Sequence, residues 1–365
     1  MNPLFGEIRR NRLLWLLALV PVVLVAHKLK PDAHTMLFVL SVLAIIPLAA
    51  LMSHATESVA SKTGDGVGGL LNATFGNMTE LIIALTALKA GEYMLVKATI
   101  AGAIVTNTLF MLGMSFLLGG LKHHVQEYNK LNARLLSGML FVATVALLMP
   151  SAIGKTNTET AGGVIQPLSV GLAILLIVSY GLSLLFSLKT HRQEFVSVDH
   201  GEDEAETPWP MGLALTALLG VTVLVALVSE IFVESVQVAA EDFGMTPAFV
   251  GFIIVALVGA AAEMVAAFSA DRKNHLDLSV GIALGSASQI ALFVAPVLVL
   301  ASYFIGPSPM DLQFGPGAVV MILIAALIAN IVTSNGRSAW FVGVLLLLLY
   351  LIYAMTLYVL PPGSG

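Results

Sequence analysis

The sequence predicts an all-α polytopic membrane protein with eleven transmembrane helices, in which one extra N-terminal helix precedes two inverted five-helix repeats. The first reason is composition, because 58% of the 365 residues are hydrophobic and only 11% are charged. Soluble domains carry roughly 25% charged residues, so this chain has too few polar groups to cover a water-facing surface. The second reason is an internal repeat, in which Glu263 is equivalent to Glu80.

Eleven apolar stretches come close to or exceed the roughly 20 residues that a transmembrane helix needs. They lie at 13–28, 35–58, 67–90, 94–119, 134–152, 164–188, 211–236, 247–270, 277–304, 316–334 and 338–360. The predicted organisation has four parts: an N-terminal transmembrane helix (1–30), a first five-helix repeat (31–188), an acidic cytoplasmic linker (189–210) and a second five-helix repeat (211–365).

The distribution of positive charge predicts the orientation of these helices. With a cytoplasmic N-terminus, twelve Lys and Arg residues fall in inside segments and five in outside segments, as the positive-inside rule requires. Arg9, Arg10 and Arg12 precede the first stretch, but Pro21 interrupts it and no convincing cleavage site follows. We therefore expect a transmembrane helix rather than a signal peptide. The odd helix count places the C-terminus outside, and the compact loops favour a prokaryotic cell membrane.

The internal repeat relates helices two to six to helices seven to eleven. A shift of 177 residues pairs Glu57 with Glu234. Because each unit has an odd number of helices, the two units must lie in the membrane with opposite orientations, as in alternating-access transporters. A shift of 183 superposes glutamates, glycines and apolar residues: Gly76 on Gly259, Glu80 on Glu263, Gly102 on Gly285, and Leu109 and Phe110 on Leu292 and Phe293.

Glu80 and Glu263 are the principal candidate site residues, because a charged side chain in the middle of a transmembrane helix costs about 2.5–3.5 kcal/mol or more. Helical spacing places Asn72, Gly76 and Thr79 on the face of Glu80. Small residues around Glu263 allow close helix approach. The alternative interpretation is a carboxyl that a neighbour keeps neutral and that only contributes to helix packing. This alternative fits a single glutamate better than a symmetric pair.

Helices four and nine supply further polar candidates. Helix four contains Thr106 and Asn107, and helix nine contains Ser286, Ser288 and Gln289. Serine and threonine often bond to the backbone of their own helix. Asparagine and glutamine are not satisfied so easily inside a membrane, so Asn107 and Gln289 are the stronger candidates.

Two carboxylates surrounded by amide, hydroxyl and carbonyl oxygens describe a site for a hard cation. Calcium takes 6–8 oxygen ligands, and two carboxylates neutralise its charge. Zinc and copper prefer imidazole or thiolate, whereas the chain has no cysteine and no histidine on these faces. Without the metal, burial and mutual repulsion favour protonation of the carboxyls. The pair can therefore hold one divalent cation or protons but not both, which is the physical basis of exchange.

Three more acids near helix ends are candidates for proton transfer and gating: Glu57, Glu230 and Glu234. Glu57 falls at the cytoplasmic end of helix two and Glu234 at the outer end of helix seven, so they can line opposite funnels. The alternative is that all three are ordinary solvated carboxylates. His54 lies one turn before Glu57, and we expect it to be a hydrogen-bonded partner rather than a ligand. The acidic run of the linker is typical of a solvated segment.

Three short segments resemble the calcium/proton exchangers, the CAX branch of the cation/calcium antiporter superfamily. GNMTEL at 76–81 resembles the GNxTEL signature of that family's first repeat. GAAAEM at 259–264 is similar to the second signature, usually GNAAEH, and GSASQIALF at 285–293 is similar to the segment GSxxQIAL. The resemblance covers nearly the whole chain, including the extra first helix and the acidic linker.

This resemblance implies that Glu80 and Glu263 form the central cation- and proton-binding pair. It also implies that unwound backbone near Gly76 and Gly259 supplies carbonyl ligands. The chain departs from the second signature where Ala260 replaces asparagine and Met264 replaces histidine, which removes two polar groups from helix eight. The neighbours that the resemblance implies for the pair are Asn77, Ser286 and Gln289.

The resulting hypothesis is a secondary antiporter that exchanges Ca²⁺ for H⁺, with a site at the bilayer midplane and no catalytic residues or cofactor. Alternatives are an exchanger of Na⁺, K⁺ or Mn²⁺ on the same fold, a cation channel, and an intramembrane enzyme that uses the acid pair. GDGVGG at 64–69 follows a membrane helix rather than a strand, so it predicts no dinucleotide site. We expect the lipid bilayer and the transported ions as partners, without nucleotide or nucleic acid.

Overall fold

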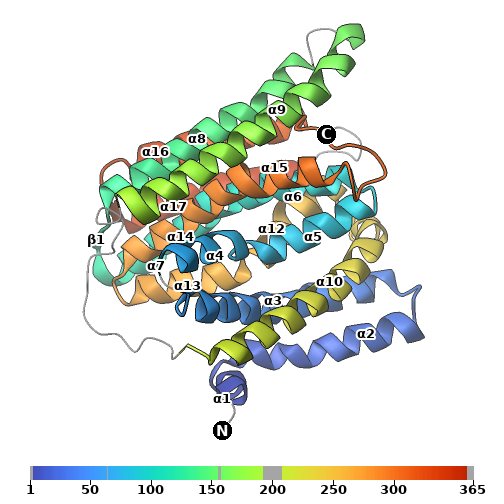
Figure 1. The fold of residues 1–365 in the computed structure, drawn as a ribbon, viewed down its shortest axis with the longest axis horizontal. Coiled ribbons are helices and arrows are strands. Elements are labelled where there is room, and N and C mark those ends of the chain that lie inside the picture. The colour runs from blue at the N-terminus through green and yellow to red at the C-terminus, as the bar shows by residue number, and fades with distance from the viewer. Residues whose placement is uncertain (1–2, 64, 155–157, 192–207, 360–365) are drawn as a thin grey trace.

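The computed structural model describes residues 3–63, 65–154, 158–191 and 208–359. Long helices lie side by side and account for most of these residues (Figure 1). Within the described part, nine helices are long and apolar enough to cross a membrane, and one bent helix pair makes a tenth candidate. The chain is therefore a multi-pass membrane protein, as its composition predicts.

The helices of the N-terminal half begin with a short helix outside the predicted spans. Their bounds are α1 Pro3–Arg10, α2 Leu19–Leu29 (preceded by a 3₁₀ turn, Arg12–Ala18), α3 His34–Ala60, α4 Asp65–Phe75, α5 Met78–Lys89, α6 Tyr93–Val105, α7 Leu112–His123, α8 Lys130–Ile153 and α9 Thr158–Leu185. A π-helical segment, Thr106–Met111, joins α6 to α7 without a break, and another, Phe186–Thr190, extends α9.

The helices of the C-terminal half follow a similar order. Their bounds are α10 Met211–Asp242, α11 Pro247–Phe249, α12 Ala256–Gly259, α13 Ala261–Arg272, α14 Leu276–Gln289, α15 Ala295–Ala301, α16 Pro316–Thr333 and α17 Trp340–Val359. π-Helical segments join α11 to α12 (Val250–Val255) and α14 to α15 (Ile290–Val294). The strands β1 (Val125–Glu127) and β2 (Arg337–Ala339) pair antiparallel and tie the two halves together.

Nine of the eleven predicted stretches coincide with single helices, and the other two are divided. The stretch 67–90 consists of α4 and α5, which are separated by Gly76 and Asn77. The stretch 247–270 bends by 57° between Gly259 and Ala261. The apolar stretches alone give no sign of either break, but the unwound backbone near Gly76 and Gly259 that the resemblance implies is confirmed at both places. Both breaks fall at or next to a glycine, which is a weak helix former and leaves the backbone exposed.

The two long helices α3 and α10 pack against each other in opposite directions. Phe38, near the start of α3, stacks on Phe232 of α10 with ring centroids 5.5 Å apart. At the other end, the backbone N–H of Trp209, just before α10, donates to the Ser58 hydroxyl of α3 at 3.1 Å. Together with α2 they lie on one side of the remaining helices (Figure 1). This pairing positions Glu57 at one end of the molecule and Glu234 towards the other.

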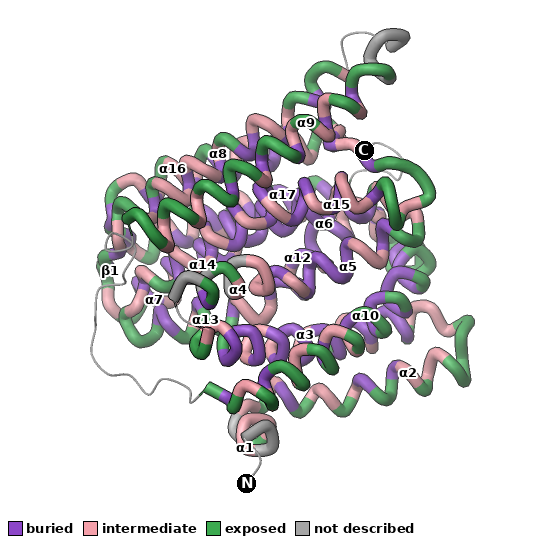
Figure 2. Tube along the Cα trace, in the orientation of Figure 1, coloured by how far each residue is buried: buried purple, intermediate pink, exposed green. Residues whose placement is uncertain are grey.

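The most enclosed helices are those that carry the neutral polar candidates. In an apolar stretch of 18 residues, 83% of the residues are buried in Tyr93–His123 and 72% in Leu276–Ala301, against 22% in Gly163–Thr190. Figure 2 shows the same contrast, with buried residues concentrated in the central helices and exposed ones along α2 and α9. Asn107 and Ser286 are therefore held inside protein rather than facing lipid.

Candidate cation-binding site

The two broken helices place Glu80 and Glu263 in the same local position. Glu80 is the third residue of α5 and Glu263 is the third residue of α13. The two carboxylates lie close enough for their like charges to interact. Gly259 packs directly on Glu80, because a Cβ added at Gly259 would lie 2.9 Å from the Glu80 Cγ. The end of α12 thus forms a close-fitting wall for the Glu80 side chain.

Four neutral side chains form a continuous hydrogen-bonded chain beside this pair. The Asn107 Nδ2 donates to the Ser286 Oγ at 2.8 Å, and the Ser286 Oγ donates to the Asn77 Oδ1 at 2.8 Å. The Asn77 Nδ2 in turn donates to the Gln289 Oε1. Asn77 comes from the break between α4 and α5, whereas its partners Ser286 and Gln289 come from α14. This row of hydrogen bonds therefore joins the first half of the protein to the second half at the site.

A cavity of about 280 Å³ reaches this site from one end of the molecule. We call it the site cavity; it is lined by Ser53, Glu57, Gly76, Asn132, Glu263, Ala266, Asp277, Leu278, Gly281, Ile282, Gly285, Ser286 and Gln289. A second cavity of about 560 Å³, the access cavity, shares Ser53, Glu57, Ala266 and Leu278 with it and extends to α1. The Oε2 atom of Glu263 is buried and has no hydrogen-bond partner.

This arrangement offers oxygen ligands to a cation. Among the described residues, no three His, Cys, Asp or Glu side chains gather closely enough to hold a metal by themselves. The donors here are instead two carboxylates, the amide and hydroxyl oxygens beside them, and the carbonyls at the ends of α4 and α12. The buried Oδ1 atom of Asn107 also has no hydrogen-bond partner. Such a set suits a hard cation, and each carboxylate can take up a proton instead.

The structure brings most of the predicted site residues together. Glu80 contacts Gly259, Asn107 contacts Ser286, and Asn77 contacts Ser286 and Gln289. The site cavity, which Ser286 and Gln289 also line, adds two predicted residues to this cluster: Gly76 and Glu263. Glu57 lines both cavities and receives a hydrogen bond from Ser53 at 3.3 Å.

Two of the predicted gating residues lie away from the site. The Glu230 Oε1 is 3.6 Å from the Lys89 Nζ, and the Glu234 Oε2 is 3.9 Å from the His27 Nε2. Their side chains are 52% and 57% exposed. These two acids thus differ from Glu57, which faces a cavity that leads to Glu263.

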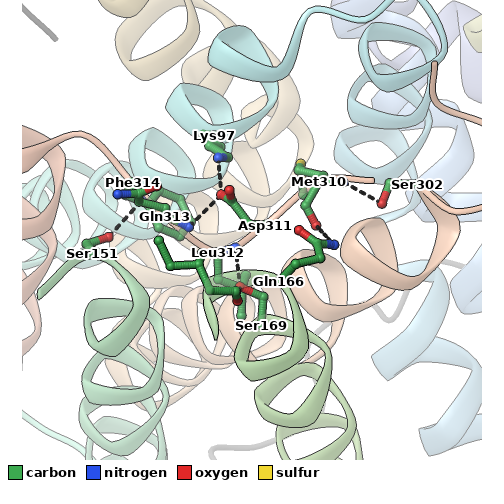
Figure 3. A network of polar contacts seen from close by, with 11 residues as sticks. Lys97, Ser151, Gln166, Ser169, Ser302, Met310, Asp311, Leu312, Gln313 and Phe314 are labelled. Carbon is green, nitrogen blue, oxygen red and sulfur yellow. Dashed lines mark hydrogen bonds and ion pairs between the residues drawn. The ribbon is translucent and has the colours of Figure 1, made fainter. Parts of the chain in front are cut away.

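The opposite end of the molecule is held together by a loop, 302–315, between α15 and α16 (Figure 3). Lys97 of α6 forms an ion pair with Asp311 of this loop at 2.5 Å, and Tyr93 hydrogen-bonds to Ser308. Backbone N–H groups of the loop donate to three serine hydroxyls: Met310 to Ser302 at 2.8 Å, Leu312 to Ser169 at 3.0 Å, and Phe314 to Ser151 at 2.8 Å. We call this the stapled end, and the end with the cavities the open end.

Sequence reasoning missed three polar residues that line the site cavity: Ser53, Asn132 and Asp277. Asp277 stands in the first turn of α14, so in the sequence it resembles an ordinary acid at a helix start. Asn132 lies near the start of α8, which the sequence gives no reason to place beside Glu263. The repeat gave one indication. Asp277 is equivalent to the uncharged Met94, so this acid departs from the symmetry of the two halves.

The departures from the family signature are visible at the second break. Ala260 is 1% exposed and makes no side-chain cap for α13, and Met264 is 7% exposed. At the first break, Asn77 provides amide groups that bind Ser286 and Gln289. The side chain of Asn72 and most of the predicted linker, residues 192–207, lie outside the described residues.

These features define a multi-pass membrane protein with a pair of acids at two broken helices. The chain belongs to the sodium/calcium exchanger protein family, whose model matches it twice, at residues 33–189 and 213–359. The Ca(2+)/H(+) antiporter of Aphanothece halophytica is 42% identical over 95% of this chain and 96% of its own length. The Ca(2+)/H(+) antiporter ChaA of Bacillus subtilis (strain 168) is 40% identical over 96% of this chain and its full length. The solved structure of native YfkE has a TM-score of 0.81 at 37% identity and covers 94% of this chain and 98% of its own.

Proposed function

We propose that the protein is a secondary antiporter that exchanges Ca²⁺ for H⁺ by alternating access, with Glu80 and Glu263 as its central site. The observation that carries this proposal is the meeting of two acids, each at the start of a half-helix, beside one cavity lined with oxygen atoms. The high identity to two Ca(2+)/H(+) antiporters along nearly the whole chain supports the choice of ions.

Mutually exclusive occupancy of the acid pair explains the exchange. A Ca²⁺ ion needs both carboxylates ionised, since together they neutralise its charge. When the ion leaves, two like charges in a poorly hydrated site favour proton uptake. The protein can then change between its two states while the site is neutral, because the acid pair holds either the metal ion or protons. Ion flux in one direction is thereby coupled to proton flux in the other.

The proposed topology has eleven transmembrane helices, counting α4 with α5 and α12 with α13 as one broken helix each. It keeps the four-part division at residues 30, 188 and 210 and the inverted relation between the two repeats. Two separate matches to one family model, one in each half, support this relation. With the N-terminus in the cytoplasm and the C-terminus outside, the open end faces the cytoplasm of a prokaryotic cell.

The test is Ca²⁺ uptake into proteoliposomes with an imposed pH gradient, in the parent protein and in the variants Glu80→Gln and Glu263→Gln. We expect uptake that requires the gradient, saturates with Ca²⁺ and disappears in both variants. Uptake without the gradient indicates a channel or another counter-ion, and replacing Ca²⁺ by Na⁺, K⁺ or Mn²⁺ tests the alternative cations. Activity that survives in either variant contradicts the paired site.

A further inference from the structure

Asp277 is an acid that lines the site cavity but has no role in the central site formed by Glu80 and Glu263. Among the described residues that line the cavity, three carry carboxylates, Glu57, Glu263 and Asp277, and none is Lys, Arg or His. The access cavity, by contrast, is lined by Lys273 and two histidines as well as acids. Of the three acids, Glu57 also lines the access cavity with these basic residues, whereas Glu263 and Asp277 line the site cavity alone. Asp277 stands with Glu57 along the path between the open end and Glu263.

We propose that Asp277 is a capture residue that raises the affinity for the cation on the open side of the protein only. This inference rests on the proposed cation transport and adds a residue to it. A cavity with low-dielectric walls focuses the field of the charges that line it, so it raises the local cation concentration and the association rate. Asp277 is half-buried, and its field is therefore screened less than that of a fully exposed acid.

The inverted repeat makes the effect one-sided. In the first repeat, the position equivalent to Asp277 is Met94, near the start of α6. Met94 is 53% exposed and carries no charge. The stapled end therefore lacks an acid at this position, although the central residues Glu80 and Glu263 occupy equivalent positions. The two faces of one transporter thus differ in how strongly they attract a cation before it reaches the shared site.

The competing explanation is a structural role. The Asp277 Oδ1 accepts the backbone N–H of Asn129 at 2.8 Å and so ties the start of α8 to the start of α14. The substitution Asp277→Asn separates the two roles, because its amide oxygen can accept the same hydrogen bond while the charge is lost. Asp277→Glu keeps the charge, and Asp277→Ala removes both charge and acceptor.

The experiment measures the KM for Ca²⁺ separately from each face. The chain has no cysteine, so Ser269→Cys in the access cavity, introduced in every variant, lets a membrane-impermeant thiol reagent block those carriers whose open end faces the outside of the vesicle. Initial rates measured with and without the reagent then give the KM for Ca²⁺ at each of the two faces. Each variant is measured at low and high ionic strength, between which the Debye length falls from about 30 Å at 0.01 M to about 3 Å at 1 M.

We expect Asp277→Asn to raise the KM from the open side about three- to tenfold at low salt with an unchanged kcat. The difference should shrink at high salt, the KM from the other side should not change, and Asp277→Glu should behave like the parent. An unchanged KM in Asp277→Asn overturns the inference. So does a loss of kcat from both faces that does not depend on salt, which indicates a structural role.

A failure of the proposed function can be distinguished from a failure of the inference about Asp277. If the parent transports no Ca²⁺, then Ca²⁺ binding to the detergent-solubilised parent and Asp277→Asn, measured by titration calorimetry at both salt concentrations, decides the role of Asp277. Weaker and less salt-dependent binding in the variant supports the capture role. Equal binding in the two proteins refutes it.

Discussion

Two acids of the open end and three acids of the stapled end have different surroundings in this molecule. At the open end, Glu57 and Asp277 line a cavity that continues to Glu263. At the stapled end, Glu230 lies beside Lys89, Glu234 beside His27 and Asp311 beside Lys97. The difference exists although Glu57 and Glu234 are equivalent positions of the repeat. A sequence symmetry between the two halves is thus compatible with different surroundings for equivalent acids among the described residues.

On the proposed mechanism, this contrast identifies the structure as one of two alternating states. In the other state, the acids of the stapled end would line a path to the site, and the cavities of the open end would close. The acid pair and the hydrogen-bonded chain of Asn77, Asn107, Ser286 and Gln289 lie between the two ends. They must serve both states, whereas the residues at either end serve one.

The largest expected difference between the two ends is the accessibility of equivalent positions. Ala266 lines both cavities, whereas the equivalent residue Ile83 is only 2% exposed. In the metal-free protein, we expect Ala266→Cys to react with a hydrophilic thiol reagent at least about 100-fold faster than Ile83→Cys, because a buried cysteine reacts only after local opening. Equal rates would show that the two ends are equally open and would break the comparison.

The packing of Gly259 on Glu80, which lies between the two ends, is tested by Gly259→Ala. The new methyl group would lie 2.9 Å from the Glu80 Cγ and would force the carboxylate to move. Since displacing a reacting group by about 1 Å can cost about 100-fold, we expect transport to fall about 10- to 100-fold while the protein still folds. Gly171→Ala is the matched control, because no atom lies within 4 Å of its added Cβ. Normal transport by Gly259→Ala would show that Glu80 is not held in one position.

A smaller difference is expected between Glu57→Gln and Glu234→Gln. Glu57 lines the path to the site, so its neutralisation should raise the KM for Ca²⁺ from the open side about three- to tenfold at low salt. Glu234 is 57% exposed on its side chain and lies beside His27, so the same change from the same side should stay within about twofold. Flux assays on oriented vesicles measure both. A larger effect from Glu234 in this assay would contradict the assignment of the two ends.

The smallest expected effect concerns the Lys97–Asp311 pair, whose side chains are 21% and 28% exposed. A pair that is only partly buried should contribute about 1 kcal/mol of coupling energy. Lys97→Met, Asp311→Asn and the double variant form a cycle that isolates this energy. Thermal unfolding in detergent provides the measurement. Strictly additive effects of the two substitutions would show that the pair does not hold the loop in place.

The sequence predicted the class of fold and the core of the candidate site for physical reasons. Membrane helices appear as apolar stretches of fixed length, and a buried glutamate such as Glu80 is conspicuous within one. The repeat made Glu263 its equivalent and the family resemblance implied the same pair, and the structure places both near Asn77, Asn107 and Ser286. Symmetry predicted that the two glutamates meet, whereas Asn77 and Ser286 were expected beside them from the family resemblance.

The remaining features depend on geometry that the sequence does not display. The breaks at Gly76 and Gly259 leave the apolar pattern unchanged, so the pattern did not reveal them and only the family resemblance implied unwound backbone there. Asp277 resembles a helix-start acid, and only the packing of α14 against α8 and α13 places it in the cavity. The different surroundings of Glu57 and Glu234 follow from the conformational state, which no pattern of residues encodes.

The central claim is that one acid pair holds either Ca²⁺ or protons. The direct test is calorimetric titration of the solubilised protein with Ca²⁺ in several buffers of different ionisation enthalpy, which yields both the affinity and the number of protons released. We expect the parent to release protons as it binds Ca²⁺, and Glu80→Gln and Glu263→Gln each to bind far more weakly. Tight Ca²⁺ binding without proton release in the parent, or unchanged affinity in either variant, would contradict the account.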